Sequence, residues 1–245
     1  MKRLFVIVPV YKAAPYLEPC LRAICSQAMP PDWVYGVFLG VDACQESLDA
    51  ITTQGYLKPD GVYVFWSQDN VGSYVMRNSL VSSLPEPLSD DVLVFLDADD
   101  IVRPGILEHL LLSLERNPDV RVARYLCHAF SDVDGSHRIP EHNRGFCDGS
   151  FAIWRSTFRE MGGFQPWRHA ADTEFHYRLT ANGHPSLYLP FVGVEYRIHA
   201  HNESKNNGEG LRLLALAEME YAIRLEEGRH FEPVPRTVTP LEVVG

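Results

Sequence analysis

The 245-residue sequence contains no apolar run that approaches the ~20 residues of a membrane-spanning helix. Its start, Met1-Lys2-Arg3, leads within a few residues to Pro9, too early for the apolar core of a signal peptide. We therefore expect a cytoplasmic protein without a transmembrane segment. Peripheral contact with a membrane stays open.

Cysteine is scarce, and its pattern excludes two common uses. The chain has five cysteines, an odd number, and none of them forms a C-x-x-C pair. Neither a disulfide framework nor a zinc knuckle is indicated, so we expect free thiols.

Positive charge is also in short supply. The 22 Lys and Arg residues against 32 Asp and Glu residues give a formal net charge of -10. Nonspecific binding to nucleic acid draws most of its affinity from basic side chains on phosphates, so it is disfavoured. A local basic face could still form from Arg116, Arg121, Arg124 and Arg138.

The pattern of apolar runs predicts an α/β fold. The hydrophobic fraction of 46% is ordinary for a soluble enzyme with one sizeable core. Strand-like runs alternate with helical spacing in the first half, which is typical of βαβ units and a mostly parallel sheet. We predict strands at residues 4–10, 34–41, 62–66 and 92–96, and helices following Pro15, Ser47, Val71 and Pro104.

The second half of the chain has a different character. A strand is predicted at residues 120–126, whereas residues 131–149 are polar and turn-rich and suggest a long functional loop. Further elements expected are a helix running from Asp172 to Gly183, a strand at 192–198, a closing helix at 211–225 and an irregular, proline-containing tail at 231–245.

Three carboxylates follow directly after a predicted buried strand. The run Val92–Leu96 ends in Asp97-Ala98-Asp99-Asp100, and three adjacent negative charges repel unless a cation binds them. Open α/β sheets bind ligands at the carboxyl ends of their strands, and hard divalent cations commonly take one or two carboxylates plus substrate phosphates. The motif therefore indicates a metal and nucleotide-diphosphate site. The alternative is that Asp99 or Asp100 caps the helix expected after Pro104.

Two further polar residues are expected to face the same crevice. Asp42 ends another predicted strand and could accept a hydrogen bond from a nucleobase, or could be an ordinary turn residue. Arg77 carries a planar donor fork that matches diphosphate oxygens, or it lies on a solvated helix face.

Candidate proton acceptors lie in the second half. Asp172 and Glu174 follow an aromatic segment, and a carboxylate beside such a surface can remove a proton from an attacking hydroxyl. Asp172 could instead be the N-cap of a helix, and Glu174 a solvated acid in its first turn. His199 and His201 lie two residues apart at a strand end, so both point to the same side, as ligands or as rim residues.

Seven motifs in sequence resemble those of family 2 glycosyltransferases, which have the GT-A fold. The resemblance covers about the first 205 residues, through the opening Val6–Tyr11, Tyr16-Leu17 through Ser26-Gln27, Asn70-Val71-Gly72 with Arg77-Asn78, Phe95–Asp100, Gly162-Gly163-Phe164, Ala171–Phe175 with Arg178 and Gly183, and Tyr196–His199. It implies a GT-A catalytic domain at 1–205, with a nucleotide-sugar half at 1–118 and an acceptor half at 119–205. Residues 206–245 then form a C-terminal helix and tail.

The resemblance also implies roles for single residues. Donor binding would involve Pro9, Val10, Tyr11, Asp42, Arg77, Asp97 and Ala98. Asp99, with His199 as a second candidate ligand, would bind Mn²⁺ or Mg²⁺. Asp172 would be the general base of an inverting transfer from a nucleotide sugar, most often a UDP-sugar, to an acceptor hydroxyl.

The chain departs from the family pattern at two places. Asp42 is followed by Ala43 and Cys44 where many relatives have a second acid, which leaves open which nucleobase the donor site prefers. Ala171 replaces the acid that usually precedes Asp172, so Glu174 is held in reserve as a base.

Several readings of function stay open at this stage. The acceptor could be a saccharide or glycan, a protein side chain, a lipid-linked sugar or a hydroxylated nucleobase, and the oligomeric state is open. A nucleotidyltransferase is one rival, although Pro9–Lys12 is not the expected glycine- and lysine-rich phosphate loop. A catalytically silent nucleotide-sugar-binding protein is the other, because fold does not fix function.

Overall fold

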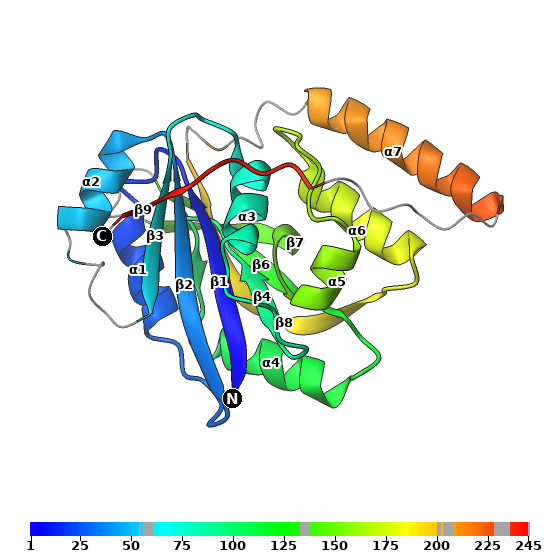
Figure 1. Ribbon diagram of the computed structural model, residues 1–245, viewed down its shortest axis with the longest axis horizontal. Coiled ribbons are helices and arrows are strands. Elements are labelled where there is room, and N and C mark those ends of the chain that lie inside the picture. Colours follow the sequence, from blue (N-terminus) through cyan, green and yellow to red (C-terminus); the bar gives the residue numbers. More distant parts are fainter. Residues whose placement is uncertain are drawn as a thin grey trace.

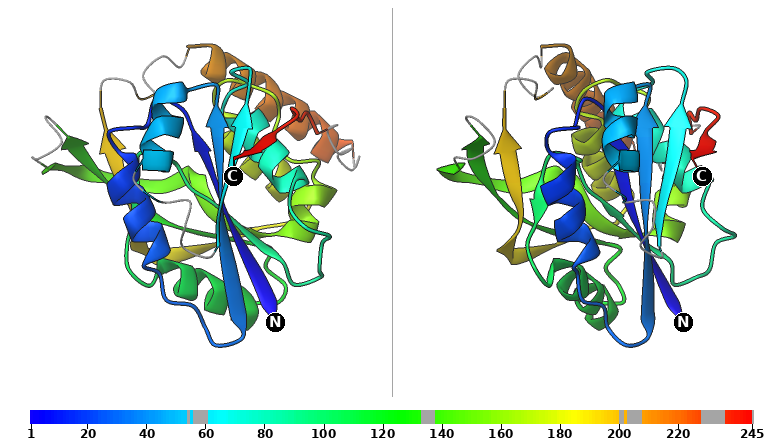
Figure 2. Two further views of the ribbon diagram at one scale, coloured as in Figure 1. Left: turned by 60° about the vertical axis from the view of Figure 1, so that its left-hand side comes forward. Right: turned by 90° about the vertical axis from the view of Figure 1, so that its left-hand side faces the viewer.

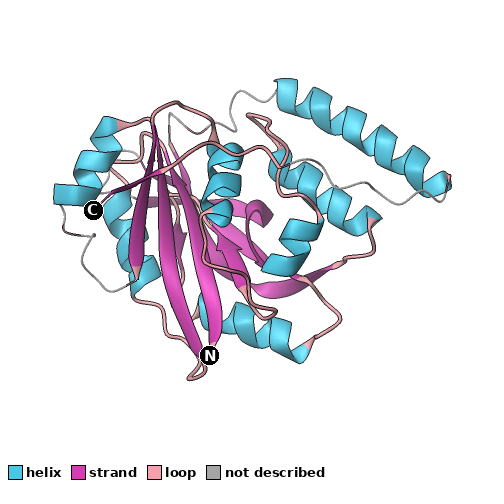
Figure 3. Cartoon of the chain, viewed as in Figure 1, coloured by secondary structure: helices cyan, strands magenta, loops and turns pink. Residues whose placement is uncertain are grey.

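The described strands form one sheet in the order β5-β8-β6-β7-β4-β1-β2-β3-β9, with helices on both of its faces (Figures 1 and 3). The computed structural model describes residues 1–53, 55, 61–132, 138–199, 202, 208–227 and 236–244. The strands are β1 Lys2–Val10, β2 Trp33–Asp42, β3 Val62–Ser67, β4 Val92–Phe95, β5 Ile101–Val102, β6 Val122–Asp132, β7 Arg138–Trp154, β8 Ser186–Ile198 and β9 Glu242–Val244. The helices are α1 Leu17–Cys25, α2 Gln45–Thr53, α3 Ser73–Ser82, α4 Ile106–Arg116, α5 Arg155–Glu160, α6 Ala171–Ala181 and α7 Gly208–Glu226.

The first strand is apolar on both faces because a helical layer covers each of them. Leu4, Val6 and Val8 pack in one core cluster, together with the buried sides of α1 and α4. Phe5 and Ile7 point the opposite way into a second cluster, which includes residues of α3, α5 and α6. This explains why β1 is a continuous apolar run rather than an alternating one.

The predicted parallel arrangement is confirmed in the first half of the chain. The strands β3, β2, β1 and β4 pair in parallel, so their carboxyl ends meet at one edge of the sheet. The second half is added through an antiparallel β4–β7 pair, followed by an antiparallel β6–β7 pair and a parallel β6–β8 pair. All predicted strands and helices of the first half are present.

The structure differs from the sequence prediction at residues 131–149. Where a loop was expected, residues 138–149 belong to the 17-residue strand β7, while residues 133–137 lie outside the described residues. Figure 2 shows the β6–β7 hairpin at one side of the molecule, where β6 pairs with β7 and also with β8 as far as Ser131. Backbone hydrogen bonds hold it, with three register shifts along the pair.

The C-terminal tail is also more ordered than the sequence suggested. Residues of β9 pair antiparallel with β3 and extend the sheet at its edge (Figure 2). Two hydrogen bonds fix the preceding segment on α3, from Asn78 Nδ2 to the Thr237 carbonyl at 3.2 Å and from the Thr239 N–H to Ser79 Oγ at 2.8 Å. Part of the predicted irregular tail, residues 231–235, lies outside the described residues.

The longest helix lies at the outside of the molecule. Helix α7 packs on α6 and is exposed along most of its length (Figure 1). None of the helices in the described ranges combines the length and the apolar character that a bilayer crossing requires.

Candidate functional site

One cavity of about 650 Å³ opens where the parallel strands end. Its walls come from both halves of the chain. The first half contributes the predicted donor-site residues, namely Pro9, Val10, Tyr11, Asp42, Arg77, Asp97, Ala98 and Asp99. The second half contributes Asp172 and His199 together with Asp148 and Gly149. Of the eleven residues that were given a role through the family resemblance, ten line this cavity and Glu174 does not.

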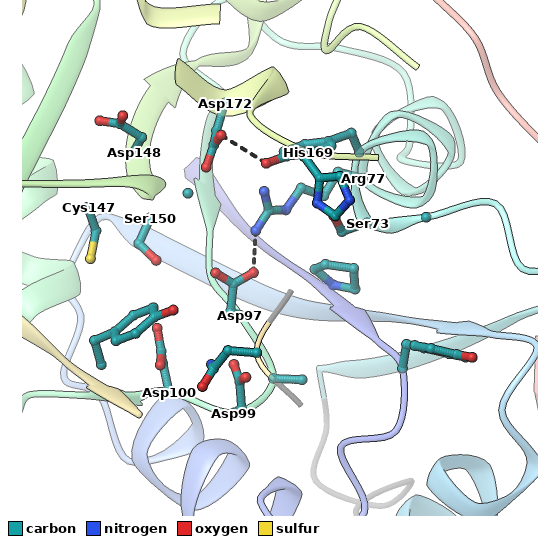
Figure 4. A pocket seen from close by; sticks show the side chains of 18 of the residues that line it. Ser73, Arg77, Asp97, Asp99, Asp100, Cys147, Asp148, Ser150, His169 and Asp172 are labelled. Carbon is teal, nitrogen blue, oxygen red and sulfur yellow. Dashed lines mark hydrogen bonds and ion pairs between the residues drawn. The ribbon is translucent and has the colours of Figure 1, made fainter. Parts of the chain in front are cut away.

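Asp97 is held by a buried arginine. Arg77 Nη2 lies 2.5 Å from Asp97 Oδ1, and the arginine side chain is only 2% exposed. The guanidinium lies within 6 Å of the ring centres of Tyr74, Phe95 and Phe164, so these rings fix its position. Figure 4 shows the pair at the centre of the cavity. Arg77 therefore orients Asp97 and offsets its charge.

Asp42 fixes the entry to α3. Its two carboxylate oxygens accept hydrogen bonds from the backbone N–H groups of Val71 and Gly72, each at 2.8 Å. Burial raises the pKa of this carboxyl, while the two hydrogen bonds oppose the shift. Gly72 adopts φ of 86°, a conformation that favours glycine. Asp42 thus shapes the cavity wall, and it also lines the cavity.

Asp99 and His199 form the pair that the sequence proposed as metal ligands. His199 Nε2 lies 2.9 Å from Asp99 Oδ2, although the residues are 100 positions apart. In the described part of the chain, no group of three or more His, Cys, Asp or Glu side chains is arranged to hold a metal. Two protein ligands still suit a hard cation whose other ligands are substrate phosphate oxygens and water. The donor set therefore fits Mn²⁺ or Mg²⁺, while His201 lies outside the described residues.

The third acid of the motif has a structural role. Asp100 is 3% exposed, and its Oδ1 accepts the backbone N–H of Arg197 at 2.9 Å, which ties β8 to the motif. Burial raises its pKa well above the usual value, and the charges of Asp99 and Asp97 add to the effect. Helix α4 begins only at Ile106, after Gly105, so neither Asp99 nor Asp100 caps it.

Asp172 lies in the first turn of α6 and is not its N-cap, because the N-cap is Ala170. Asp172 Oδ1 accepts hydrogen bonds from Tyr74 Oη at 2.8 Å and from the Thr173 N–H at 2.9 Å. Burial raises the pKa of Asp172, while Arg77 and the Tyr74 hydroxyl oppose the shift. A carboxylate that is fixed, buried and faces a cavity has the properties of a general base.

Backbone strain gathers around the same cavity. Three non-glycine residues have positive φ in the described part of the chain, namely Lys12, Ala43 and Ala170. Lys12 and Ala170 line the cavity, and Ala43 follows Asp42. Such strain is commonly found at functional sites, where the surrounding structure holds the strained backbone in place.

Comparison with known proteins places the chain in a family. The family model "Glycosyltransferase like family 2" matches residues 2–178, which is more than half of the sequence. The chain belongs to this family. The resemblance inferred from the seven motifs is thereby confirmed, and the domain is that of a glycosyltransferase.

The curated relatives of this family 2 domain are distant and longer. Glycosyltransferase AglE of Haloferax volcanii is 32% identical over 94 residues, which cover 38% of this chain and 29% of AglE. Glycosyltransferase GlyG of Streptococcus pneumoniae serotype 4 is 22% identical over 161 residues, covering 65% of this chain and 50% of GlyG. The chain thus spans half or less of the length of these relatives.

A solved structure confirms the expected GT-A fold. The crystal structure of GalNAc-T7 with UDP, GalNAc and Mn²⁺ superposes with a TM-score of 0.64 over 82% of this chain and 44% of the other. The sequence identity is 18%, so this likeness shows the fold alone.

Glu174, the residue held in reserve as a base of this glycosyltransferase domain, lies away from the cavity. Glu174 is fully buried and ion-paired with Arg178, whose Nε and Nη2 lie 2.8 and 2.7 Å from its carboxylate oxygens. Tyr221 of α7 donates a further hydrogen bond to it. On a helix, positions 172 and 174 face different sides, so only one of the two acids can reach the cavity.

Sequence reasoning missed several residues of the cavity wall, among them Tyr74, Asp148 and Gly149. Tyr74 lies one helical turn before Arg77, so its helix position was a usable signal. Asp148 and Gly149 lie in the segment expected to be a loop, where no periodicity marks them. A Cβ added at Gly149 would lie 3.2 Å from both Asp97 Oδ2 and Asp172 Oδ2, so the glycine keeps the space between these two carboxylates open.

Proposed function

We propose that this chain transfers a sugar from a nucleotide-diphosphate sugar, with UDP as the nucleotide, to the hydroxyl of a saccharide acceptor, with inversion at the anomeric carbon. One observation carries the proposal. The donor-side acids Asp97 and Asp99 and the candidate base Asp172 face one cavity, and Gly149 leaves room between Asp97 and Asp172. A reacting sugar needs such a space between a leaving-group site and a base.

The donor side has the residues to hold a charged diphosphate. Asp99 and His199 would hold Mn²⁺ or Mg²⁺, and GalNAc-T7, which shares the fold, was crystallised with Mn²⁺ and UDP. When bound, a divalent cation neutralises the negative charge that grows on a departing diphosphate. Asp97, oriented by Arg77, is positioned to accept hydrogen bonds from the ribose or the donor sugar.

The acceptor side has one base in a fixed orientation. Asp172 accepts the proton of the acceptor hydroxyl as its oxygen attacks the anomeric carbon, while Tyr74 and Thr173 hold the carboxylate in place. Attack from the face opposite the leaving group inverts the anomeric configuration. The proposal therefore predicts a product whose anomeric configuration is opposite to that of the donor, measurable by proton NMR.

Metal-dependent hydrolysis of nucleotide sugars tests the function without a known acceptor. A panel of UDP-, GDP- and CMP-sugars with Mn²⁺ or Mg²⁺ should give slow release of the nucleotide from a UDP-sugar, abolished by EDTA. Asp99→Ala should weaken metal-dependent donor binding by about 10–100-fold, because it removes one of two candidate metal ligands. Asp119→Asn, at an exposed position outside the cavity, is the matched control.

Two results would contradict this function. No hydrolysis of any nucleotide sugar with either metal would exclude donor activation. Release of pyrophosphate from UTP and a sugar phosphate would identify a nucleotidyltransferase instead.

A further inference from the structure

Two neighbouring aromatic side chains are exposed on β7 and β8, and one of them, Phe146, lines the cavity. Phe146 of β7 is 37% exposed and Tyr188 of β8 is 51% exposed. Their ring centres lie 4.6 Å apart, and the rings meet at 66°. They form two faces of an open corner rather than part of the buried core. Burying such rings is favourable, so exposed pairs of this kind often mark binding surfaces.

A buried arginine holds this corner in place. Arg124 of β6 is 6% exposed, and its guanidinium lies 5.9 Å from the Phe146 ring centre and 5.4 Å from that of Tyr188. Arg124 is ion-paired with Asp148, and its Nη1 lies 3.4 Å from Tyr188 Oη. We call Arg124, Phe146 and Tyr188 the aromatic corner. Because its arginine is buried and paired, the corner is ordered before any ligand binds.

The aromatic corner connects directly to the candidate base. Asp148 accepts a hydrogen bond from Thr173 Oγ1 at 2.7 Å, and the Thr173 N–H donates to Asp172 at 2.9 Å. Thr173 therefore bridges the two carboxylates. Phe146, Asp148 and Asp172 all line the cavity, and Figure 4 shows Asp148 on the opposite side of the Asp97–Asp172 pair from Ser73. The corner thus lies beside the base and away from the wall formed by α3.

The chemistry of the corner matches one class of ligand. A pyranose ring presents an apolar C–H face, which packs on aromatic rings, and a polar edge of hydroxyls. The Asp148 side chain is 32% exposed and retains acceptor capacity for such hydroxyls. Since Asp148 compensates the charge of Arg124, a neutral sugar fits better than a phosphorylated acceptor.

We infer that the aromatic corner is an acceptor subsite, in which Phe146 and Tyr188 pack on a neutral pyranose ring while Asp148 hydrogen-bonds its hydroxyls. This inference rests on the proposed function and adds to it the position of the saccharide acceptor and the neutral character of the sugar ring bound there. The sugar bound there would present a neighbouring hydroxyl to Asp172.

Direct binding of saccharides tests the subsite. Saturation-transfer NMR is recorded with methyl β-glucoside, methyl β-galactoside, lactose, maltose and chitobiose, in the presence of UDP and Mg²⁺. At least one saccharide should bind with its ring protons in contact with the protein. Phe146→Ala and Tyr188→Ala should each weaken that binding about fivefold to tenfold, as loss of one aromatic contact would do. Tyr188→Phe should retain it, because the ring remains.

A matched control separates lost binding from lost folding. Tyr63 of β3 is 50% exposed and stacks on Phe38 with ring centres 4.8 Å apart, remote from the cavity lining. Tyr63→Ala should leave saccharide binding unchanged, and circular dichroism of all variants verifies their fold. Should Phe146→Ala not fold, Tyr188→Ala at its more exposed position carries the test.

The outcomes distinguish this inference from the proposed function. If no saccharide binds the wild-type chain, or binding is unaffected by substitution of both aromatic residues, the subsite is overturned. Acceptor-free hydrolysis of a UDP-sugar by the wild type and by Tyr63→Ala reports on the proposed function separately. If the wild type hydrolyses a UDP-sugar but binds saccharides equally well without the two aromatic side chains, the subsite is overturned and the proposed function stands.

Discussion

The two halves of the molecule build their parts of the cavity in different ways. In the first half, parallel strands end at one edge of the sheet, and Asp42, Asp97 and Asp99 lie at or just after those ends. In the second half, Phe146, Asp148 and Gly149 lie inside a long antiparallel strand with register shifts. The ends of the parallel strands determine where the acids of the first half point. Strand pairing and bulges determine where the cavity residues of β7 point.

The halves also differ in how their acids are stabilised, and one contact crosses between them. Asp97 is paired with Arg77 of its own half. Asp172 receives its side-chain hydrogen bond from Tyr74, which belongs to α3 of the first half. The candidate base is therefore assembled only when the two halves pack together.

The largest expected effect separates the halves by function. Asp172→Asn should lower transfer by about 10²–10⁴-fold, because an amide cannot accept the hydroxyl proton. Donor binding should persist, since Asp97, Asp99 and His199 are unchanged. Calorimetric titration with the UDP-sugar and a product assay measure the two quantities. Normal turnover by this variant would show that Asp172 is not the base. The Asp99→Ala variant should show the converse defect, a loss of donor binding.

The next effect concerns Glu174, the acid of α6 that the sequence analysis held in reserve as a base. Arg178→Met leaves Glu174 buried without its ion-pair partner and should lower the free energy of unfolding by about 3–5 kcal/mol. Chemical denaturation measures the change. Arg212→Met, which breaks the exposed Arg212–Glu209 pair, is the matched control and should have no measurable effect. Equal stability of both variants would contradict the structural role of Glu174.

The smallest expected effect tests the contact between the halves. The Tyr74 hydroxyl stabilises ionised Asp172 and lowers its pKa, so Tyr74→Phe should raise that pKa further. Because a general base acts in its ionised form, the acidic limb of kcat/KM should move to higher pH. Tyr35→Phe, whose hydroxyl contacts the Cys25 carbonyl away from the cavity, should leave the limb in place. An unshifted limb in Tyr74→Phe would argue against Asp172 as the titrating base.

Sequence reasoning succeeded where local pattern and position coincide. The run Val92–Leu96 before Asp97 predicted both a buried strand and a cluster of acids at its end, and both are present. It failed at residues 138–149, because hairpin pairing is made by backbone groups and leaves no trace in side-chain periodicity. It also kept Glu174 as a possible base, since two acids in one helical turn look alike until the packing of α7 is known.

The order of the strands and helices from β1 to β4, the acids after β4 and membership in family 2 follow from the amino-acid sequence, because apolar periodicity and short motifs are local properties. The tertiary structure decided which acid faces the cavity, that His199 meets Asp99 across 100 residues, and that Tyr74 holds Asp172. These contacts depend on strand register and helix packing, which join residues far apart in the chain, so they arise only in the folded molecule.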